Sequence, residues 1–412
     1  MTILLIGHDA NRAGAPLVLL NLMRLLKAEG VQMRLVLGEG GPLLADFQAI
    51  CPVTIWPAPE PYVMGALADK VLGKLGLWQQ LHERQTQAQQ HDILAQLDLK
   101  SVDLVLVNTV AASHWFSQLT IPDNTPVVTF VHELAMSVRI YSRPDELAHL
   151  LNRTTHLLAV SKATARYYEL EHGFDPARIT LYTLIDTPSL ERNVKQARDQ
   201  PSVYASLGLP ANALVVGGCG NAEWRKGNDL FIALARQVIG QASVEVSVGA
   251  HNEPGLNQPI HFVWVGMPPG SLHDDLVLDI HKAGLTNQVH LIPPTPEVLR
   301  YMSRFDVFVL CSREDPYPLV VFEAGLCGIP VVCFEGAGGS PELVEADGGF
   351  VVPYLDLATM SNRVLELLSQ PELRHKLGNR LGHKILERHP ARQSVDTLVY
   401  LFNKLTSNQL TS

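Results

Sequence analysis

The sequence predicts an α/β fold with two doubly wound parallel sheets, and three observations carry this prediction. Short runs rich in Val, Ile and Leu alternate with longer amphipathic stretches along the whole chain, which is typical of βαβ units. These runs are nearly continuous in apolar character, as expected of strands that are covered on both faces. The chain has 412 residues, enough for roughly two to three domains of about 150 residues each.

Six strands are expected in the first half of the chain, which we assign to an N-terminal domain over residues 1–186. They are Thr2–His8, Met33–Leu37, Val53–Trp56, Val102–Asn108, Val127–His132 and His156–Val160. After the first strand, apolar residues recur at the spacing of a helix that packs one face on a sheet; they are Leu19, Leu22, Met23 and Leu26.

The second half begins with a polar, proline-bearing stretch over residues 187–213, which we interpret as an interdomain linker and the start of a second domain over 187–390. Six further strands follow: Leu214–Gly218, Ile260–Gly266, Val289–Ile292, Val307–Cys311, Pro330–Phe334 and Phe350–Val352. Apolar residues at helical spacing in the tail predict a terminal helix over 391–412 that packs back on the N-terminal domain. Two such domains predict a ligand cleft at the carboxyl ends of their strands.

The composition is that of an ordinary globular chain, with 47% hydrophobic and 18% charged residues. The 41 acidic and 32 basic residues give a net charge of −9, which argues against a nucleic-acid partner held by bulk charge. The five cysteines are scattered and lie mostly in apolar runs, which is typical of reduced, buried thiols. Because the first residues do not resemble a signal peptide and no apolar run reaches about 18 residues, we expect a cytoplasmic location.

The most informative stretch is VFVLCSREDPYPLVVFEAGLCGIPVV, residues 307–332, in which a predicted strand is followed by a polar loop and a helix that begins with a proline. The free backbone N–H groups of Leu319 and Val320 at this helix start favour a phosphate. Asp315 and Glu323 flank that position, where carboxylates suit hydroxyl groups. A ligand with a sugar, a diphosphate and a second sugar in a row fits. The alternative is an ordinary strand, loop and helix with a solvated Asp and Glu.

A second candidate is GGCGNAEWRKGND, residues 217–229, which follows the first strand of the second domain. Its glycines allow a close approach of the backbone, while Arg225 and Lys226 offer positive charge for a diphosphate leaving group. The stretch fails as a dinucleotide fingerprint because Glu223 occupies the place of the third glycine. The alternative is a glycine turn with a solvated basic pair.

Two residues of the N-terminal domain also lie at the carboxyl ends of predicted strands, where parallel sheets bind ligands. Gly14 lies at the mouth of the first helix, and His132 closes the strand VVTFVHE. The chain holds 16 histidines, and a lone histidine is more often structural, so both roles stay open for His132.

Several motifs are absent from the sequence: the P-loop, the G-x-S-x-G elbow, a cysteine and histidine metal cluster, H-E-x-x-H and D-x-D. An enzyme of sugar nucleotides with this sequence would lack the common acidic pair for a divalent metal. We therefore expect a site without a metal cofactor, in which the helix dipole and basic residues stabilise the leaving group.

These residues resemble the GT-B fold glycosyltransferases of family 4, which transfer a sugar from a nucleotide donor with retention of anomeric configuration. The segment from Asp315 to Glu323, continuing as EAGLCGIPVV, is similar to the family's E-x7-E element. The resemblance implies that Glu323 holds the donor ribose and Asp315 the hydroxyls of the transferred sugar. It assigns the diphosphate to the amides of Leu319 and Val320. The later run GGSPELVEADGGFVVP is similar to a second family motif, with Glu342 at its acidic position.

Two departures of this chain from the family pattern concern the candidate site. The first glutamate of the element is aspartate here, with Glu314 beside it, so either carboxylate can meet the donor sugar. Asn221 follows Gly220 in the stretch 217–229 and stands where the family has an arginine. Lys226 matches the family's lysine, and Arg225 is expected to supply the missing charge.

The resemblance implies two Rossmann-like domains that face each other across a cleft, with Gly14 near the diphosphate and His132 beside the donor sugar. It implies transfer from a nucleoside-diphosphate sugar, of unknown base, to a hydroxyl of a saccharide or lipid-linked glycan acceptor, as in polysaccharide biosynthesis. Two alternatives are a non-catalytic subunit that binds nucleotide sugars and a GT-B fold epimerase or phosphorylase. The first would bind donor without transfer, and the second would turn over donor without an added acceptor.

Access to a lipid-linked acceptor would involve at most peripheral contact with the inner face of a membrane. Segment Val63–Arg84 is a candidate for this contact, because it combines an apolar face with Lys70, Lys74 and Trp78. The negative net charge favours the alternative, a helix or lid of the acceptor domain.

Overall fold

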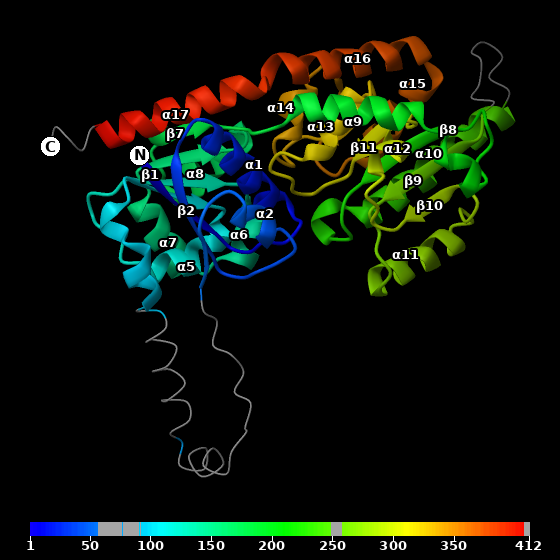
Figure 1. Ribbon diagram of the computed structural model, residues 1–412. Coiled ribbons are helices and arrows are strands. Elements are labelled where there is room, and N and C mark those ends of the chain that lie inside the picture. Colours follow the sequence, from blue (N-terminus) through cyan, green and yellow to red (C-terminus); the bar gives the residue numbers. More distant parts are fainter. Residues whose placement is uncertain (57–75, 77–89, 91, 249–257, 408–412) are drawn as a thin grey trace. The chain divides into compact units, whose positions relative to one another are not determined.

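The computed structural model describes residues 1–56, 76, 90, 92–248 and 258–407 (Figure 1). Apart from Gly76, the segment Val63–Arg84 lies outside the described residues. The chain divides into two compact units, each built on one parallel sheet. The first unit comprises Met1–Val160, Ala165–Leu184 and Arg392–Ser412, and the second comprises Ser161–Thr164 and Ile185–Ala391.

The first unit holds a seven-stranded parallel sheet in the order β3-β2-β1-β4-β5-β6-β7. Its strands are β1 (Thr2–Gly7), β2 (Gln32–Leu37), β3 (Val53–Ile55), β4 (Leu104–Asn108), β5 (Val127–Val131), β6 (His156–Ala159) and β7 (Ile179–Leu181). The helices that accompany them in sequence, with the terminal helix, are α1 (Gly14–Ala28), α2 (Leu44–Gln48), α5 (Ser113–Ser117), α6 (Ala135–Tyr141), α7 (Pro144–Arg153), α8 (Lys162–His172) and α17 (Ala391–Ser407). Short 3-10 turns are η1 (Leu99–Ser101), η2 (Val110–Ala112) and η3 (Pro176–Arg178).

The strand order of this sheet reverses beside β1. After β1 the chain runs outward through β2 to β3 and then returns to β4 on the other side of β1. The carboxyl ends of β1 and β4 therefore form a switch point of the kind where open parallel sheets bind ligands. His8 and Thr109 directly follow these two strand ends.

The second unit repeats this plan with a six-stranded parallel sheet in the order β10-β9-β8-β11-β12-β13 and a switch point between β8 and β11. Its strands are β8 (Leu214–Cys219), β9 (Ile260–Val265), β10 (Val289–Ile292), β11 (Val307–Leu310), β12 (Val331–Phe334) and β13 (Gly349–Val352). Its helices are α9 (Thr187–Asp199), α10 (Asn228–Val248), α11 (Ser271–Lys282), α12 (Val298–Met302), α13 (Leu319–Leu326), α14 (Ser340–Val344), α15 (Leu357–Ser369) and α16 (Pro371–Arg388), with 3-10 turns η4 (Val203–Leu207) and η5 (Trp224–Lys226).

Helices cover both faces of the second sheet. One buried cluster packs side chains of α10, α11 and α15, such as Phe231 and Met360, on one face. A second cluster packs side chains of α9, α12 and α13, such as Val194 and Phe322, with the other set of strand side chains. Because both faces are buried, the strands read as continuous apolar runs in the sequence. The predicted α/β class with doubly wound sheets is confirmed.

Two predictions about local structure are wrong. Residues 187–213 are not a linker: the helix α9 occupies Thr187–Asp199, and the side chain of Asp186 caps it by accepting the Ser189 N–H at 3.0 Å. The polar sequence suggested a linker because only one narrow stripe of this helix is buried. Strand β7 was missed because it has three residues, all half-buried or exposed.

Several predicted strands also extend beyond the observed ends. His8, Trp56, His132, Val160 and Cys311 each stand just after a strand. The apolar pattern continues past the last paired residue, so it overestimates strand length. Across the described residues, no helix combines the length and apolarity needed to cross a bilayer.

Candidate active site

A charged cluster lies at the switch point of the second sheet. Arg225 and Lys226 belong to η5, which follows β8, and Asp315 belongs to the loop that follows β11. The Lys226 ammonium lies 2.6 Å from one oxygen of Asp315, and the Arg225 guanidinium lies 3.4 Å from the other. Asp315 is only 5% exposed. The structure thus brings together three of the residues that the sequence singled out.

Two glycines let the loops of this cluster approach closely. Gly227 has a φ of +70°, and a Cβ there would lie 2.0 Å from the carbonyl oxygen of Cys311. Gly338 has a φ of +136°, and a Cβ there would lie 1.9 Å from the carbonyl oxygen of Asp315. The Asp315 N–H donates to the carbonyl of Ala337 at 2.6 Å. Three loops are thereby held together through their backbones.

The remaining contacts of Asp315 leave capacity for a ligand. Ser312 donates its hydroxyl to Asp315 at 3.2 Å, and Arg225 also donates to the carbonyl oxygen of Glu314 at 3.1 Å. A carboxylate can accept about four hydrogen bonds, and three protein groups approach that of Asp315. Sequence analysis missed Ser312, although a polar side chain just after a strand end is a usable signal.

The start of helix α13 presents unpaired backbone donors. Pro318 is the N-cap in an extended conformation, and the Val321 N–H donates to the Pro318 carbonyl at 3.1 Å. The N–H groups of Leu319 and Val320 make no hydrogen bond with any described residue. These donors and the helix dipole favour an anion at this point.

Glu323 lies on the same helix and is half-buried, with no charge partner among the described residues. Burial raises the pKa of its carboxyl to about 7. Within the described part of the chain, no hydrogen bond or ion pair engages this carboxylate. Burial also raises the pKa of the Cys219 thiol at the end of β8 to about 12, with the Glu323 charge adding to the rise and that of Lys226 opposing it. Glu323 and Lys226 therefore both lie near the end of β8.

The other residues predicted for this site take different positions. Gly220 has a φ of +148°, and a Cβ there would lie 3.4 Å from the Lys226 side chain. Asn221, next to it, is exposed. Glu342 does not join the cluster. Its carboxylate accepts the backbone N–H groups of Lys162 at 2.9 Å and Ala163 at 2.7 Å, within the same unit.

A second polar group lies at the switch point of the first sheet. His132, just after β5, has its Nε2 atom 3.0 Å from the side-chain oxygen of Asn108 at the end of β4. Burial and the neighbouring His8 lower the pKa of His132 to about 3, so the ring is neutral. Gly14 is the exposed first residue of α1, and a Cβ there would meet no atom within 4 Å. Its backbone is therefore open to a ligand.

Glu133, which follows His132 at the same strand end, also belongs to this group. Its buried carboxylate accepts the N–H groups of His132 at 2.9 Å and Val110 at 3.4 Å, and the hydroxyl of Thr109. Burial raises the pKa of Glu133, and these hydrogen bonds oppose the rise. Thr109 has a φ of +77°, a conformation that L-residues rarely adopt. Such strain persists where the surroundings fix it and is common at functional sites.

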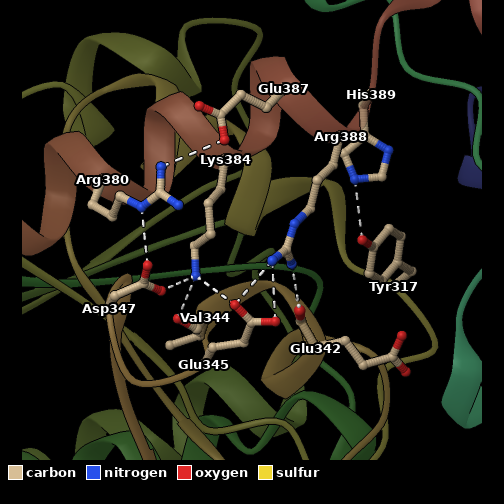
Figure 2. A network of polar contacts seen from close by, with 10 residues as sticks. All are labelled: Tyr317, Glu342, Val344, Glu345, Asp347, Arg380, Lys384, Glu387, Arg388 and His389. Atoms are coloured by element: carbon tan, nitrogen blue, oxygen red, sulfur yellow. Dashed lines mark hydrogen bonds and ion pairs between the residues drawn. The ribbon is translucent and has the colours of Figure 1, made fainter.

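A third polar group ties helix α16 to the turn after α14 (Figure 2). Lys384, 1% exposed, donates to the carbonyl of Val344 at 3.0 Å and contacts the carboxylates of Glu345 at 3.1 Å and Asp347. Arg388 donates to Glu345 at 3.0 Å. Donation from these cations lowers the pKa of both carboxyls. The network fixes the turn after α14. This helix directly follows the loop in which Gly338 approaches Asp315.

The substitution Lys384→Met is expected to lower the free energy of unfolding by about 2 to 4 kcal/mol, because a buried carbonyl and two carboxylates lose their donor. Urea unfolding at pH 7 measures this change, with the exposed Lys376→Met on the same helix as the matched control. The lowered carboxyl pKa values stabilise the fold above about pH 4.5. The difference from wild type should therefore shrink as the pH falls below about 4, and a difference independent of pH would contradict this account.

No group of three or more histidine, cysteine, aspartate or glutamate residues in the described part of the chain is placed to hold a metal ion. The unpaired amides, the basic pair and the buried carboxylates make up the chemistry of the site. Together they can bind an anion beside hydroxyl groups.

Two family models match the chain. The model "Glycosyl transferases group 1" matches residues 200–381, and the model "Glycosyltransferase Family 4" matches residues 12–183. Among curated proteins, the D-inositol 3-phosphate glycosyltransferase of Rhodococcus erythropolis is 26% identical over 242 residues, which are 55% of this chain and 51% of the relative. The chain thus spans about half the length of the curated relatives that it matches.

Solved structures share the fold over nearly the whole chain. The Anabaena protein Alr3699/HepE in complex with UDP and glucose has a TM-score of 0.72 at 19% identity, covering 98% of this chain and 99% of its own. Sucrose-phosphate synthase from Thermosynechococcus elongatus has a TM-score of 0.67 at 18% identity, covering 99% and 100%. At this identity the likeness concerns the fold, and it confirms the GT-B architecture of two Rossmann-like sheets.

Proposed function

The chain belongs to the group 1, family 4 glycosyltransferases, and from this premise we propose that it transfers a sugar from a nucleoside-diphosphate sugar to a hydroxyl of a saccharide or lipid-linked glycan, with retention of configuration. The observation that carries the proposal is the pair of unpaired N–H groups at the start of α13, on the same sheet edge as Lys226 and Arg225. A diphosphate fits that combination of donors.

Each group of the second unit has a role in this proposal. The amides of Leu319 and Val320 bind the diphosphate. The carboxylate of Glu323 accepts the ribose hydroxyls, which supply the hydrogen bonds that it otherwise lacks. Asp315 uses its remaining acceptor capacity for a hydroxyl of the transferred sugar, with Glu314 beside it.

Catalysis in this proposal is mainly electrostatic. As the bond between the sugar and the diphosphate breaks, negative charge grows on the departing diphosphate. Lys226, Arg225 and the helix dipole already point fixed positive charge at the sheet edge, so they stabilise the transition state more than the bound donor. Asp315, which also accepts the hydroxyl of Ser312, holds the Lys226 ammonium in place before the donor binds. His132 of the first unit contacts a substrate hydroxyl.

The substitution Leu319→Pro tests the proposed diphosphate site at the start of α13 directly. Residue 319 is the first of helix α13, where proline is well tolerated, and Pro318 before it is already extended with ψ 125°. The change removes one N–H and little else, so the affinity for a nucleoside diphosphate should fall about tenfold. Leu319→Ala keeps the N–H and is the matched control.

The ligands for this titration are UDP, GDP and ADP, their sugar conjugates and the free nucleosides, with and without magnesium. UDP and UDP-glucose come first because Alr3699/HepE was crystallised with them. One diphosphate should bind wild type well above its nucleoside, and Leu319→Pro should lose most of this difference. Failure of the folded protein to bind any of these ligands would overturn the proposal.

A further inference from the structure

The side chain of Asn108 has only one arrangement that satisfies both of its neighbours. It is fully buried at the end of β4, and its amide nitrogen lies 3.1 Å from the carbonyl oxygen of Ala15. A backbone carbonyl only accepts hydrogen bonds, so the NH₂ group of Asn108 must face Ala15. The amide oxygen of Asn108 therefore faces His132.

This orientation decides which ring nitrogen of His132 carries the proton. The Nε2 atom of His132 lies 3.0 Å from the Asn108 oxygen, which can only accept. Nε2 must then carry the hydrogen, because a lone pair on Nε2 would face a second lone pair. In a neutral imidazole the other nitrogen, Nδ1, then has a free lone pair.

The surroundings hold this ring in place and keep it neutral. The ring of Phe130 packs against it, with centroids 4.1 Å apart. Burial and His8 lower its pKa to about 3. Glu133, the next residue in the chain, accepts the backbone N–H of His132 and the hydroxyl of Thr109, the residue after Asn108. The ends of β4 and β5 are thus joined through Asn108 and His132, and again through Glu133.

The lone pair on Nδ1 of His132 is available to a ligand. No described residue makes a hydrogen bond to Nδ1, and it is not among the fully buried unpartnered atoms of the described residues. A group in this state accepts a hydrogen bond from a hydroxyl and does not donate a proton.

We propose that Asn108 is a positioning residue that fixes His132 in the Nε2–H form and presents Nδ1 as an acceptor for a substrate hydroxyl. The role of Nδ1 toward substrate rests on the proposed function. The tautomer itself does not, because it follows from the free protein.

The test begins with the free wild-type protein. After labelling with ¹⁵N-histidine, the ring signals of His132 are identified by their loss in His132→Gln. Between pH 6 and 8 we expect a protonated Nε2 and an unprotonated Nδ1, without titration. A protonated Nδ1, or a ring that titrates near pH 6.5, would overturn the inference. This measurement needs neither donor nor acceptor.

Two substitutions then separate positioning from mere structure. Asn108→Asp and Asn108→Leu both lose the amide N–H toward Ala15, but only Asn108→Leu also loses the acceptor for Nε2–H. We expect Asn108→Asp to keep the wild-type tautomer and a kcat within about threefold of wild type. In Asn108→Leu we expect ring signals averaged over two tautomers and a kcat about tenfold lower. The affinity for UDP should be the same in the two variants, because both lose the N–H that holds Ala15 beside Gly14.

The outcomes are distinguishable. Equal loss of kcat in Asn108→Asp and Asn108→Leu, with unchanged ring signals, would show a structural role and overturn the proposal. If Asn108→Leu does not fold, the wild-type spectrum and Asn108→Asp still decide. The expected ring signals in a protein without transferase activity would uphold the tautomer and overturn the proposed function instead.

Discussion

Replacing Lys226 with methionine is expected to lower kcat by about 10²- to 10³-fold, the cost of removing one preorganised charge from a developing anion. Its ammonium is held 2.6 Å from Asp315 and its side chain is 14% exposed, so little reorganisation is needed when the diphosphate departs. Methionine keeps most of the aliphatic volume and removes the charge. The loss should appear in kcat more than in the affinity for donor, because the charge on the leaving group grows only as the bond breaks.

Steady-state kinetics with a labelled donor, together with direct titration of the nucleoside diphosphate, separate these two effects. Lys282→Met, an exposed lysine at the end of α11, is the matched control and should leave kcat within about twofold. Arg225→Met should cost less than Lys226→Met, since Arg225 also contacts Glu314 and Glu223. A loss confined to donor affinity would contradict a role for Lys226 in the transition state.

The sheets were predictable because their strands are buried on both faces and read as apolar runs. The site was predictable in outline for a related reason: strand ends in a parallel sheet meet at one edge. By that rule residues after β8 and β11 share one edge, and the structure has Lys226 and Asp315 there, 2.6 Å apart. Helix α9 escaped prediction because its buried stripe contains few residues, of which Val194 and Ala197 are examples.

Partners that depend on register could not be predicted. The contact between Asn108 and His132 exists because β4 and β5 pair with Asn108 opposite Phe130, two residues before His132. Nothing in the local sequence fixes that register. Glu133 is similar, since its value as an acceptor depends on the strained turn at Thr109. Such residues can be found only once strand neighbours are known.

Glu323→Gln is expected to have two effects of opposite sign. The carboxylate is half-buried and has no partner among the described residues, and burial raises its pKa from the ordinary 4.5 to about 7. Between these two values the folded state holds a proton that the unfolded state has lost, so stability falls as the pH rises from about 4.5 to 7. Above about pH 7 the desolvated charge costs the fold about 3 kcal/mol. Glutamine removes that cost, so the variant should melt higher than wild type at pH 8 and equally at pH 4.

The same substitution should weaken donor binding by about 10- to 100-fold at pH 8, because a neutral amide is a poorer acceptor for two ribose hydroxyls than a carboxylate. Wild-type affinity should itself fall as the pH drops below about 7 and the carboxyl gains its proton, whereas that of Glu323→Gln should not change for this reason. Glu335→Gln, an exposed residue after β12, is the control for both measurements.

Thermal melts at the two pH values and titrations of the nucleotide sugar check both effects. A melting gain of the same size at pH 4 would show that the charge of Glu323 is not the destabilising group. A gain at pH 8 without loss of donor affinity would place the ribose elsewhere. Both effects together would show that the charge of Glu323 destabilises the free protein and is needed for donor binding. The bound donor would then supply the hydrogen bonds that the free protein lacks.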